Sequence, residues 1–174
     1  YSIEDLAENA SFEEVAYLLL LGKLPTSSEL AEFEDELMNQ RTMPDSLVSV
    51  VESIPASAHP MEVVRTIISY MGVIEPEKSF DDQLAIAKRL IGVTTTAIVY
   101  WYNFSHNGVK VSQDSGERSL AGHFLKLLRQ EDIPELDKKT LDVSLTLYAE
   151  HEFNASTFTG RVCASTLSDL HSCL

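Results

Sequence analysis

Helix start and stop signals recur along this chain from end to end, and they constrain its fold more than any other feature. Ser11 is followed three residues later by Glu14, and Thr26 stands in the same relation to Glu29. A Ser or Thr with an acidic residue at this spacing is a capping box, which satisfies two free N–H groups at a helix start. No pair of segments with alternating apolar residues competes with this pattern. The sequence therefore predicts an all-α fold.

The helices follow from these signals and from apolar residues that recur at intervals of three and four. Gly72 marks one expected helix end, Arg41 is expected to complement the dipole at the end of another, and Asn107 with Gly108 stops the longest. Residues 109–119 are the most loop-like stretch. We expect helices at residues 11–22, 26–41, 46–52, 60–72, 80–108, 119–130, 136–152 and 156–174.

The last expected helix carries small residues on one face. Ser156, Gly160, Ala164 and Ser168 are each four positions from the next. Small side chains let another helix approach closely. We therefore expect this face to be packed inside an oligomer or a larger core.

Two cysteines, Cys163 and Cys173, are expected in that same helix. They are ten residues apart, which corresponds to about 15 Å of helix rise. A disulfide cannot span that distance unless the helix unwinds. We therefore expect free thiols, as in a reducing cell interior.

Composition limits the class of protein and its partners. The chain has 174 residues, of which 44% are hydrophobic, and this is enough for one domain with a sizeable core. With 27 acidic and 13 basic residues, its formal net charge is -14. Such a charge repels phosphate backbones and anionic membranes, so we expect neither as a partner. No apolar run approaches the roughly 18 to 20 residues that a membrane span needs.

His151 is the sharpest candidate for a functional side chain. It lies between Glu150 and Glu152 at an expected helix end, where the helix dipole and both carboxylates favour the imidazolium form. Asn154, three residues further on, offers an amide or a cap for the break that follows. A charged histidine beside an asparagine is suited to holding a small carboxylate substrate. The alternative is a histidine that only neutralises the end of its own helix.

Other conspicuous residues have structural explanations. His59 precedes Pro60 and is expected to help cap a helix, whereas the consecutive aromatic residues 100–102 are expected to pack at an interface. His106 is expected in a turn, and His123 and His171 carry less weight. The sequence contains no metal-ligand spacing, P-loop, GxGxxG or GxSxG. We therefore expect no metal site, and no serine hydrolase or nucleotide-binding function.

Longer stretches carry a resemblance. In order along the chain they are YSIEDLAENASFEEVAYLLLLGKLPTSSEL, SAHPMEVVRT, YWYNFSHNG, SLAGHFLKLL and LYAEHEFNASTFTGRVCASTLSD. Together they cover almost the whole chain, and the sequence resembles the citrate synthase family. SLAGHFLKLL and YWYNFSHNG are most similar to its 2-methylcitrate synthase branch.

The resemblance implies a function for the candidate site. Members of this family are all-helical dimers that condense an acyl-CoA with oxaloacetate. A carboxylate removes the α-proton of the thioester, a histidine stabilises the enol, the enol attacks the keto carbon, and hydrolysis releases CoA, without a metal or other cofactor. The family's E-H-E-x-N-A-S-T segment implies that His151 binds oxaloacetate and that Asn154 lies beside the same pocket. Residues 84–104 and 141–167 match helices of the family's dimer interface.

The resemblance also implies that residues 1–174 form the amino-terminal part of the large helical domain. We expect the rest of that domain and the small domain to lie outside this chain. The family's catalytic histidine belongs to a G-P-x-H-G-G motif, and a second histidine and the catalytic aspartate follow it. We expect all three beyond Leu174, so these residues alone should not turn over substrate. The start at Tyr1, and a final helical pattern without a stop signal, agree with a fragment.

The sequence leaves two questions open. The acyl donor is propionyl-CoA or acetyl-CoA, because the residues that select it are not identified. A competing hypothesis of another class is a non-catalytic helical module that only dimerises. We expect a cytoplasmic protein, or one of the mitochondrial matrix in a eukaryote.

Overall fold

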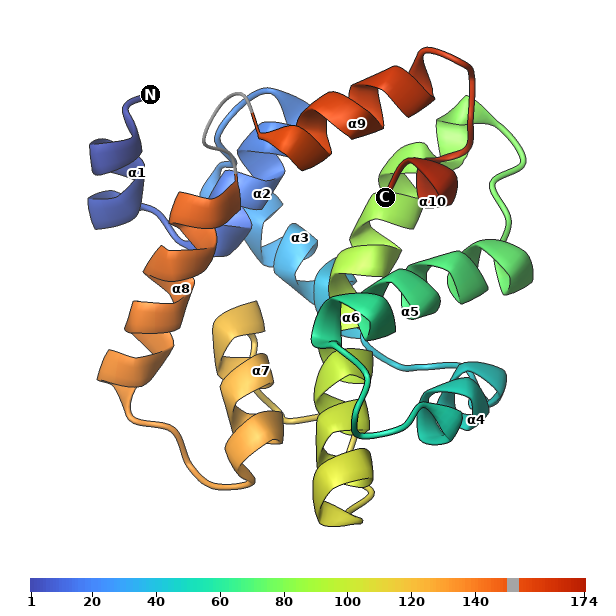
Figure 1. Cartoon of the computed structure of the whole chain (residues 1–174). Helices are drawn as coiled ribbons and strands as arrows, with labels where there is room; N and C mark the ends of the chain where they lie inside the picture. Colours follow the sequence, from blue (N-terminus) through green and yellow to red (C-terminus); the bar gives the residue numbers. More distant parts are fainter. Residues whose placement is uncertain (150–153) are drawn as a thin grey trace.

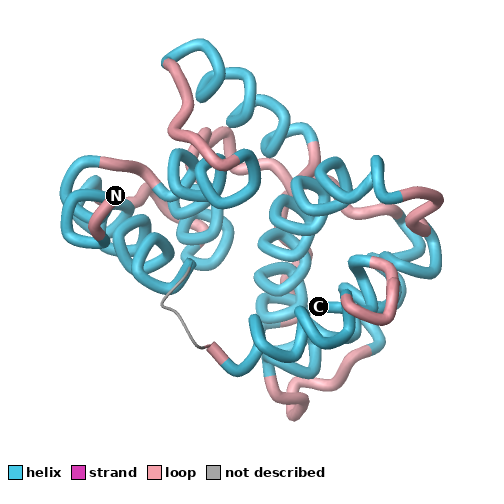
Figure 2. Tube along the Cα trace, turned by 90° about the horizontal axis from the view of Figure 1, so that it is seen from above, coloured by secondary structure: helices cyan, strands magenta, loops and turns pink. Residues whose placement is uncertain are grey.

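A computed structural model describes residues 1–149 and 154–174 of the chain. Every element within these ranges is a helix, which confirms the predicted all-α class (Figures 1 and 2). The helices are α1 (Ile3–Asn9), α2 (Phe12–Leu21), α3 (Ser27–Asn39), α4 (Asp45–Ser53), α5 (Pro60–Ile74), η1 (Phe80–Asp82), α6 (Gln83–Asn107), α7 (Leu120–Arg129), α8 (Glu135–Ala149), α9 (Ala155–Ala164) and α10 (Leu170–Cys173).

Both predicted capping boxes are present. The backbone N–H of Ser11 donates to Glu14 Oε2 at 2.8 Å, and the N–H of Glu14 donates to Ser11 Oγ at 3.2 Å. Thr26 and Glu29 exchange the same two bonds at the start of α3. At its other end α2 stops at Gly22, whose φ of 77° is a left-handed conformation that glycine adopts without strain.

Helix α6 forms the centre of the fold. Helices α3, α4, α5 and α7 all pack against it, and Figure 1 shows it running through the middle of the molecule. This arrangement buries a continuous apolar core. Its members that are at most 2% exposed include Leu47, Val51, Val63, Ile67, Met71, Val93, Ala97 and Trp101.

Two of the three consecutive aromatic residues in α6 belong to this core. Tyr100 and Trp101 are 4% and 2% exposed, and only Tyr102 reaches the surface. The indole N–H of Trp101 donates to the carbonyl of Ile54 at 3.3 Å. Burial and a hydrogen bond to the Glu52 carboxylate raise the pKa of Tyr100 to about 12. The prediction that these residues pack at an interface is therefore wrong for Tyr100 and Trp101.

Among the residues that the structure describes, one helical stretch is long and apolar enough, by length and composition alone, to cross a membrane. It runs over Phe80–Asn107, 28 residues, with a mean hydropathy of 1.2 in its most apolar window. No such run was expected from the sequence. In the folded chain, 44% of that window is buried. The central position of α6 in the core therefore accounts for its apolar composition.

Arg41 does not lie at a helix end facing solvent. Its guanidinium is buried between α3 and the loop before α7, where Nη1 donates to the carbonyl of Glu117 and Nη2 to that of Arg118, both at 2.5 Å. Burial lowers the pKa of Arg41, and the smaller opposing effect comes from the negative charges of Glu13 and Asp114. The expected dipole role is thus wrong, because the side chain reaches a loop that local sequence does not reveal.

Gly72 does not end α5, which continues to Ile74. A Cβ at this position would lie 2.8 Å from the Cβ of His171 on α10. That distance is shorter than carbon atoms tolerate, so the glycine permits the close approach of α10 to α5. The expected helix end is therefore wrong, and the glycine serves packing between helices.

The last helix is broken into two. Helix α9 ends at Ala164, Leu167 has a φ of 63°, and α10 begins after Asp169, whose side chain accepts the N–H of Ser172. The hydroxyl of Thr166 donates back to the carbonyl of Cys163, which competes with continued helix. The single helix expected over residues 156–174 is therefore wrong.

Candidate functional site

The predicted ligand-binding histidine, His151, lies outside the described residues. The structure gives its two flanks: α8 up to Ala149 and Asn154 at the start of α9. Oδ1 of Asn154 accepts the backbone N–H of Ser156 at 2.7 Å and that of Thr157 at 3.2 Å. These bonds satisfy two of the N–H groups that a helix start leaves open. The expected cap is confirmed, and the binding role of Asn154 stays a prediction.

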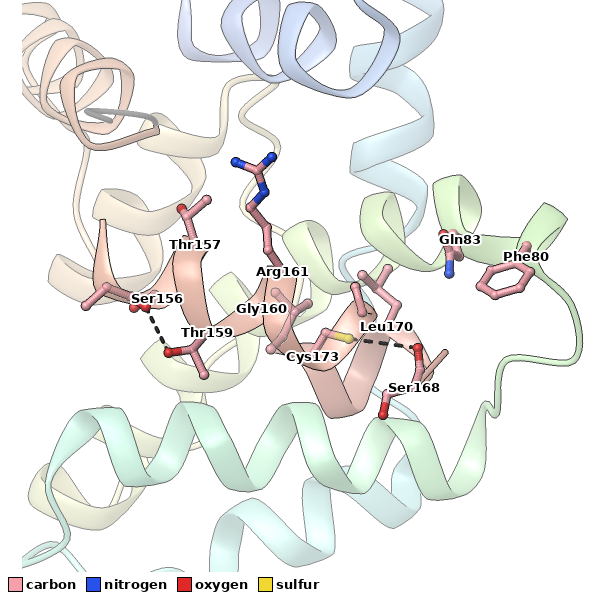
Figure 3. Close-up of a pocket in the computed structure, with 13 residues that line it drawn as sticks. Phe80, Gln83, Ser156, Thr157, Thr159, Gly160, Arg161, Ser168, Leu170 and Cys173 are labelled. Atoms are coloured by element: carbon pink, nitrogen blue, oxygen red, sulfur yellow. Dashed lines mark hydrogen bonds between the residues drawn. The ribbon is translucent and has the colours of Figure 1, made fainter. Parts of the chain in front are cut away.

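A cavity of about 740 Å³ lies beside this cap (Figure 3). It opens between α9, α10 and the residues at the start of α6. The whole predicted stripe of small residues lines it, although Ser168 belongs to the turn after α9. Its lining is Phe80, Gln83, Ala155, Ser156, Thr157, Thr159, Gly160, Arg161, Ala164, Ser168, Leu170, Cys173 and Leu174. Hydroxyl groups, small side chains and one cation thus surround a space large enough for a small ligand.

Helix α9 rests on the fold through α10 rather than through a broad apolar face. None of its residues is buried, and Phe158 and Val162 are 69% and 50% exposed. Apolar side chains of this size on a helix are ordinarily covered. The small residues face the cavity and α10, so the expected close approach of helices is met in part within the chain itself.

Arg161 is a charged member of the cavity wall that the sequence analysis did not single out. It is exposed, and in Figure 3 its side chain extends from α9 away from Cys173 and Ser168. It is the only Lys or Arg after Lys139, in a chain with a net charge of -14. That isolation was the available signal, because a carboxylate ligand near α9 would need a local positive charge.

The remaining histidines are structural. His59 caps α5, with Nδ1 accepting the N–H of Met61 at 3.2 Å, as predicted. His106 lies in the last turn of α6 and not in a turn beyond it, and its ring stacks on Tyr102 with centroids 4.6 Å apart. His171 packs on Gly72 as described above.

His123 is fully buried between α6 and the loop before α7. Its Nε2 lies 2.9 Å from Oγ1 of Thr96, and its Nδ1 lies 2.9 Å from Oγ of Ser115. Burial, assisted by the positive charge of Arg41, lowers the pKa of His123 to about 4. The imidazole is therefore neutral at physiological pH and both nitrogens have partners. Within residues 1–149 and 154–174, no three His, Cys, Asp or Glu side chains are placed to hold a metal ion.

A family model described as "Citrate synthase, C-terminal domain" matches residues 1–174. A 2-methylcitrate synthase of Shewanella oneidensis is 53% identical over 100% of this chain and 46% of its own length. A citrate synthase of Deinococcus radiodurans is 37% identical over 99% of this chain and 46% of its own length. The chain therefore spans about half the length of the curated relatives it matches.

Solved structures agree with the fold. A citrate synthase from Pyrobaculum aerophilum superimposes with a TM-score of 0.86 and 32% identity, over 99% of this chain and 46% of that one. Citrate synthase from Thermoplasma acidophilum, in a ternary complex with carboxymethyl coenzyme A and oxaloacetate, gives a TM-score of 0.88 at 27% identity. That match covers 99% of this chain and 46% of that one.

Proposed function

Because this chain belongs to the citrate synthase family, we propose that it forms part of an enzyme that condenses a short acyl-CoA with oxaloacetate. The observation that carries the proposal is the family match over all 174 residues. The Thermoplasma structure, which holds oxaloacetate and a coenzyme A derivative, supports the substrate classes. The reaction needs no metal or other cofactor, since acid–base groups and fixed hydrogen-bond donors suffice.

In the proposed mechanism, His151 and Asn154 form part of the oxaloacetate pocket. An imidazolium at position 151 would donate to a carboxylate or to the keto oxygen of the substrate, and so favour attack on the keto carbon. The double hydrogen bond from the α9 backbone to Asn154 fixes the position of that residue. The carboxylate that deprotonates the acyl-CoA, and the histidine that stabilises the enol, come from further residues of the enzyme.

We further propose propionyl-CoA as the preferred acyl donor. The support is the higher identity to the Shewanella 2-methylcitrate synthase, 53%, than to the Deinococcus citrate synthase, 37%. The test measures CoA release by the protein translated from the complete reading frame, with each acyl-CoA in turn. A higher kcat/KM with acetyl-CoA would contradict this choice of donor while leaving the condensing activity intact.

We also propose a homodimer in which α9 contributes to the interface. The exposed side chains of Phe158 and Val162 support an interface role for residues 141–167, as the family resemblance implies. The burial of nine of the 25 residues of α6 limits the contribution of residues 84–104, because a side chain in the core cannot also contact a partner. Ultracentrifugation of the complete protein measures whether it is a dimer.

The His151→Ala variant of the complete protein tests the site. It should raise the KM for oxaloacetate at least about tenfold, because a charge-assisted hydrogen bond is worth about 1.5–3 kcal/mol. His106→Ala, an exposed histidine at the end of α6, is the matched control and should leave kinetics unchanged. Unaltered oxaloacetate kinetics in His151→Ala would refute the binding role.

The second candidate function is a non-catalytic helical module that dimerises through α9. The exposed apolar residues of α9 favour it as much as they favour an enzyme dimer. If the complete protein dimerises but releases no CoA from either acyl-CoA, the module is the better description. The 174-residue chain alone should show no turnover under either proposal.

A further inference from the structure

The break between α9 and α10 changes the relation between the two cysteines. Cys163 belongs to the last turn of α9 and Cys173 to α10, so the 15 Å of rise expected for a single helix no longer separates them. The helices pack side by side, and a Cβ on Gly160 would lie 3.4 Å from the carbonyl oxygen of Cys173. Cys163, three residues after Gly160, occupies the same face of α9, about 5–6 Å further along.

Hydrogen bonds tie both cysteines to the turn between α9 and α10. The thiol of Cys173 points back along α10 toward the carbonyl of Ser168, with Sγ 3.8 Å from that oxygen (Figure 3). On the other side, Thr166 Oγ1 donates to the carbonyl of Cys163 at 2.7 Å and lies 3.2 Å from Ser168 Oγ. The cysteines are therefore linked through two residues that touch each other.

The thiols are free, accessible and close enough to influence each other. Both side chains are half-buried rather than sealed in the core. Burial raises the pKa of the Cys173 thiol, and the neighbouring Cys163 adds to this increase. Two thiolates close together repel, and the same proximity favours a bond between the sulfurs once they are oxidised.

We propose that Cys163 and Cys173 are a reversible redox pair that forms an intramolecular disulfide by exchange with a low-molecular-weight disulfide such as glutathione disulfide. One cysteine thiolate attacks a sulfur of glutathione disulfide, forms a mixed disulfide and releases one glutathione thiolate. The second cysteine loses its proton to solvent, attacks the protein sulfur of the mixed disulfide and releases the second glutathione. The protein is oxidised by two electrons and glutathione disulfide is reduced to two thiols.

The disulfide would link α9 to α10 beside the candidate site. Cys173 lines the cavity and Asn154 caps the other end of α9, so the disulfide would fix one wall of that cavity. This inference is independent of the proposed enzyme activity.

The test titrates the protein with mixtures of reduced and oxidised glutathione, followed by alkylation in denaturant, proteolysis and mass measurement of the peptide that contains Cys163 and Cys173. In oxidised wild type this peptide should be two hydrogens lighter and take up no alkylating reagent, whereas in the reduced protein it takes up two equivalents. Cys163→Ser and Cys173→Ser should each take up a single glutathione instead. The native protein should form the bond at a ratio of oxidised to reduced glutathione at least about tenfold lower than the urea-unfolded protein does.

Two outcomes would overturn the proposal. In one, Cys163 and Cys173 of wild type each take up a glutathione, or both still react with the alkylating reagent. This is judged at ratios of oxidised to reduced glutathione at which the single variants are modified. In the other, native and urea-unfolded protein form the disulfide at the same ratio, which would mean that the fold does not bring the sulfurs together. The second comparison uses wild type only, so it stands even if a variant fails to fold.

Discussion

Replacing Arg41 with methionine should lower the free energy of unfolding by about 3 kcal/mol. Methionine keeps most of the length of the side chain, so the loss isolates the guanidinium. That buried group donates hydrogen bonds to the carbonyls of Glu117 and Arg118. Without it, two carbonyls lose their donors inside the protein, and each unsatisfied buried group costs about 1–3 kcal/mol. Urea unfolding followed by circular dichroism measures the change.

The matched control is Arg118→Met. Arg118 also joins α3 to the loop before α7, through Glu34 at 3.0 Å and Asp35 at 2.9 Å, but its side chain is 51% exposed. Exposed ion pairs contribute less than about 1 kcal/mol. A loss for Arg41→Met no larger than that of the control would contradict the stabilising role of the buried guanidinium.

The contrast between these two arginines illustrates which parts of the fold can be predicted from sequence. Capping boxes such as Ser11 with Glu14 act within one turn, so local residues suffice to place a helix start. The role of Arg41 depends on carbonyls 76 and 77 residues away. No local pattern encodes such a contact.

The failures at Gly72 and in the last helix have the same origin. A glycine near the end of an apolar pattern usually stops a helix, yet here it makes room for His171 from a distant part of the chain. The break after Ala164 depends on hydroxyl groups that bond back to the backbone, and these residues occur in helices as well. The packing of α10 against α9 and α5 then favours the broken form.

For the candidate site, sequence predicted the cap at Asn154 and the stripe of small residues that lines the cavity. Both are local properties of α9. In the sequence, Arg161 stands out only as the single cation after Lys139. The cavity could not be predicted, because it needs α10 folded back against α9. The role of His151 came from resemblance and not from geometry, and it stays a prediction.

Lowering the pH should destabilise the protein through His123. In the unfolded chain this histidine has its ordinary pKa of 6.5, whereas burial beside Arg41 lowers the pKa in the folded protein to about 4. Between these values the unfolded state binds a proton that the folded state does not, so stability falls as the pH falls. The gap corresponds to about 3 kcal/mol, fully present as stabilisation above pH 6.5 and fully lost below about pH 4. Urea unfolding at half-unit steps from pH 7 to 4.5 measures the slope.

His123→Gln separates this effect from the titration of carboxylates. Glutamine keeps a polar group near Thr96 and Ser115 but binds no proton in this range, so the slope above pH 4.5 should flatten even if the variant is less stable at every pH. His106→Gln, at an exposed position, should keep the slope of wild type. Parallel curves for wild type and His123→Gln would contradict the assignment.

The same measurement on Arg41→Met connects the two predictions. The charge of Arg41 is the second cause of the low pKa of His123, after burial, and Asp114 opposes it. Removing that charge should raise the pKa of His123 in the folded protein toward 6.5, so the pH window narrows and the slope weakens. A double variant, Arg41→Met with His123→Gln, should then be no more pH-sensitive than His123→Gln alone. Residues in one buried cluster do not contribute additively, and the deviation from additivity measures the interaction between the guanidinium and the imidazole.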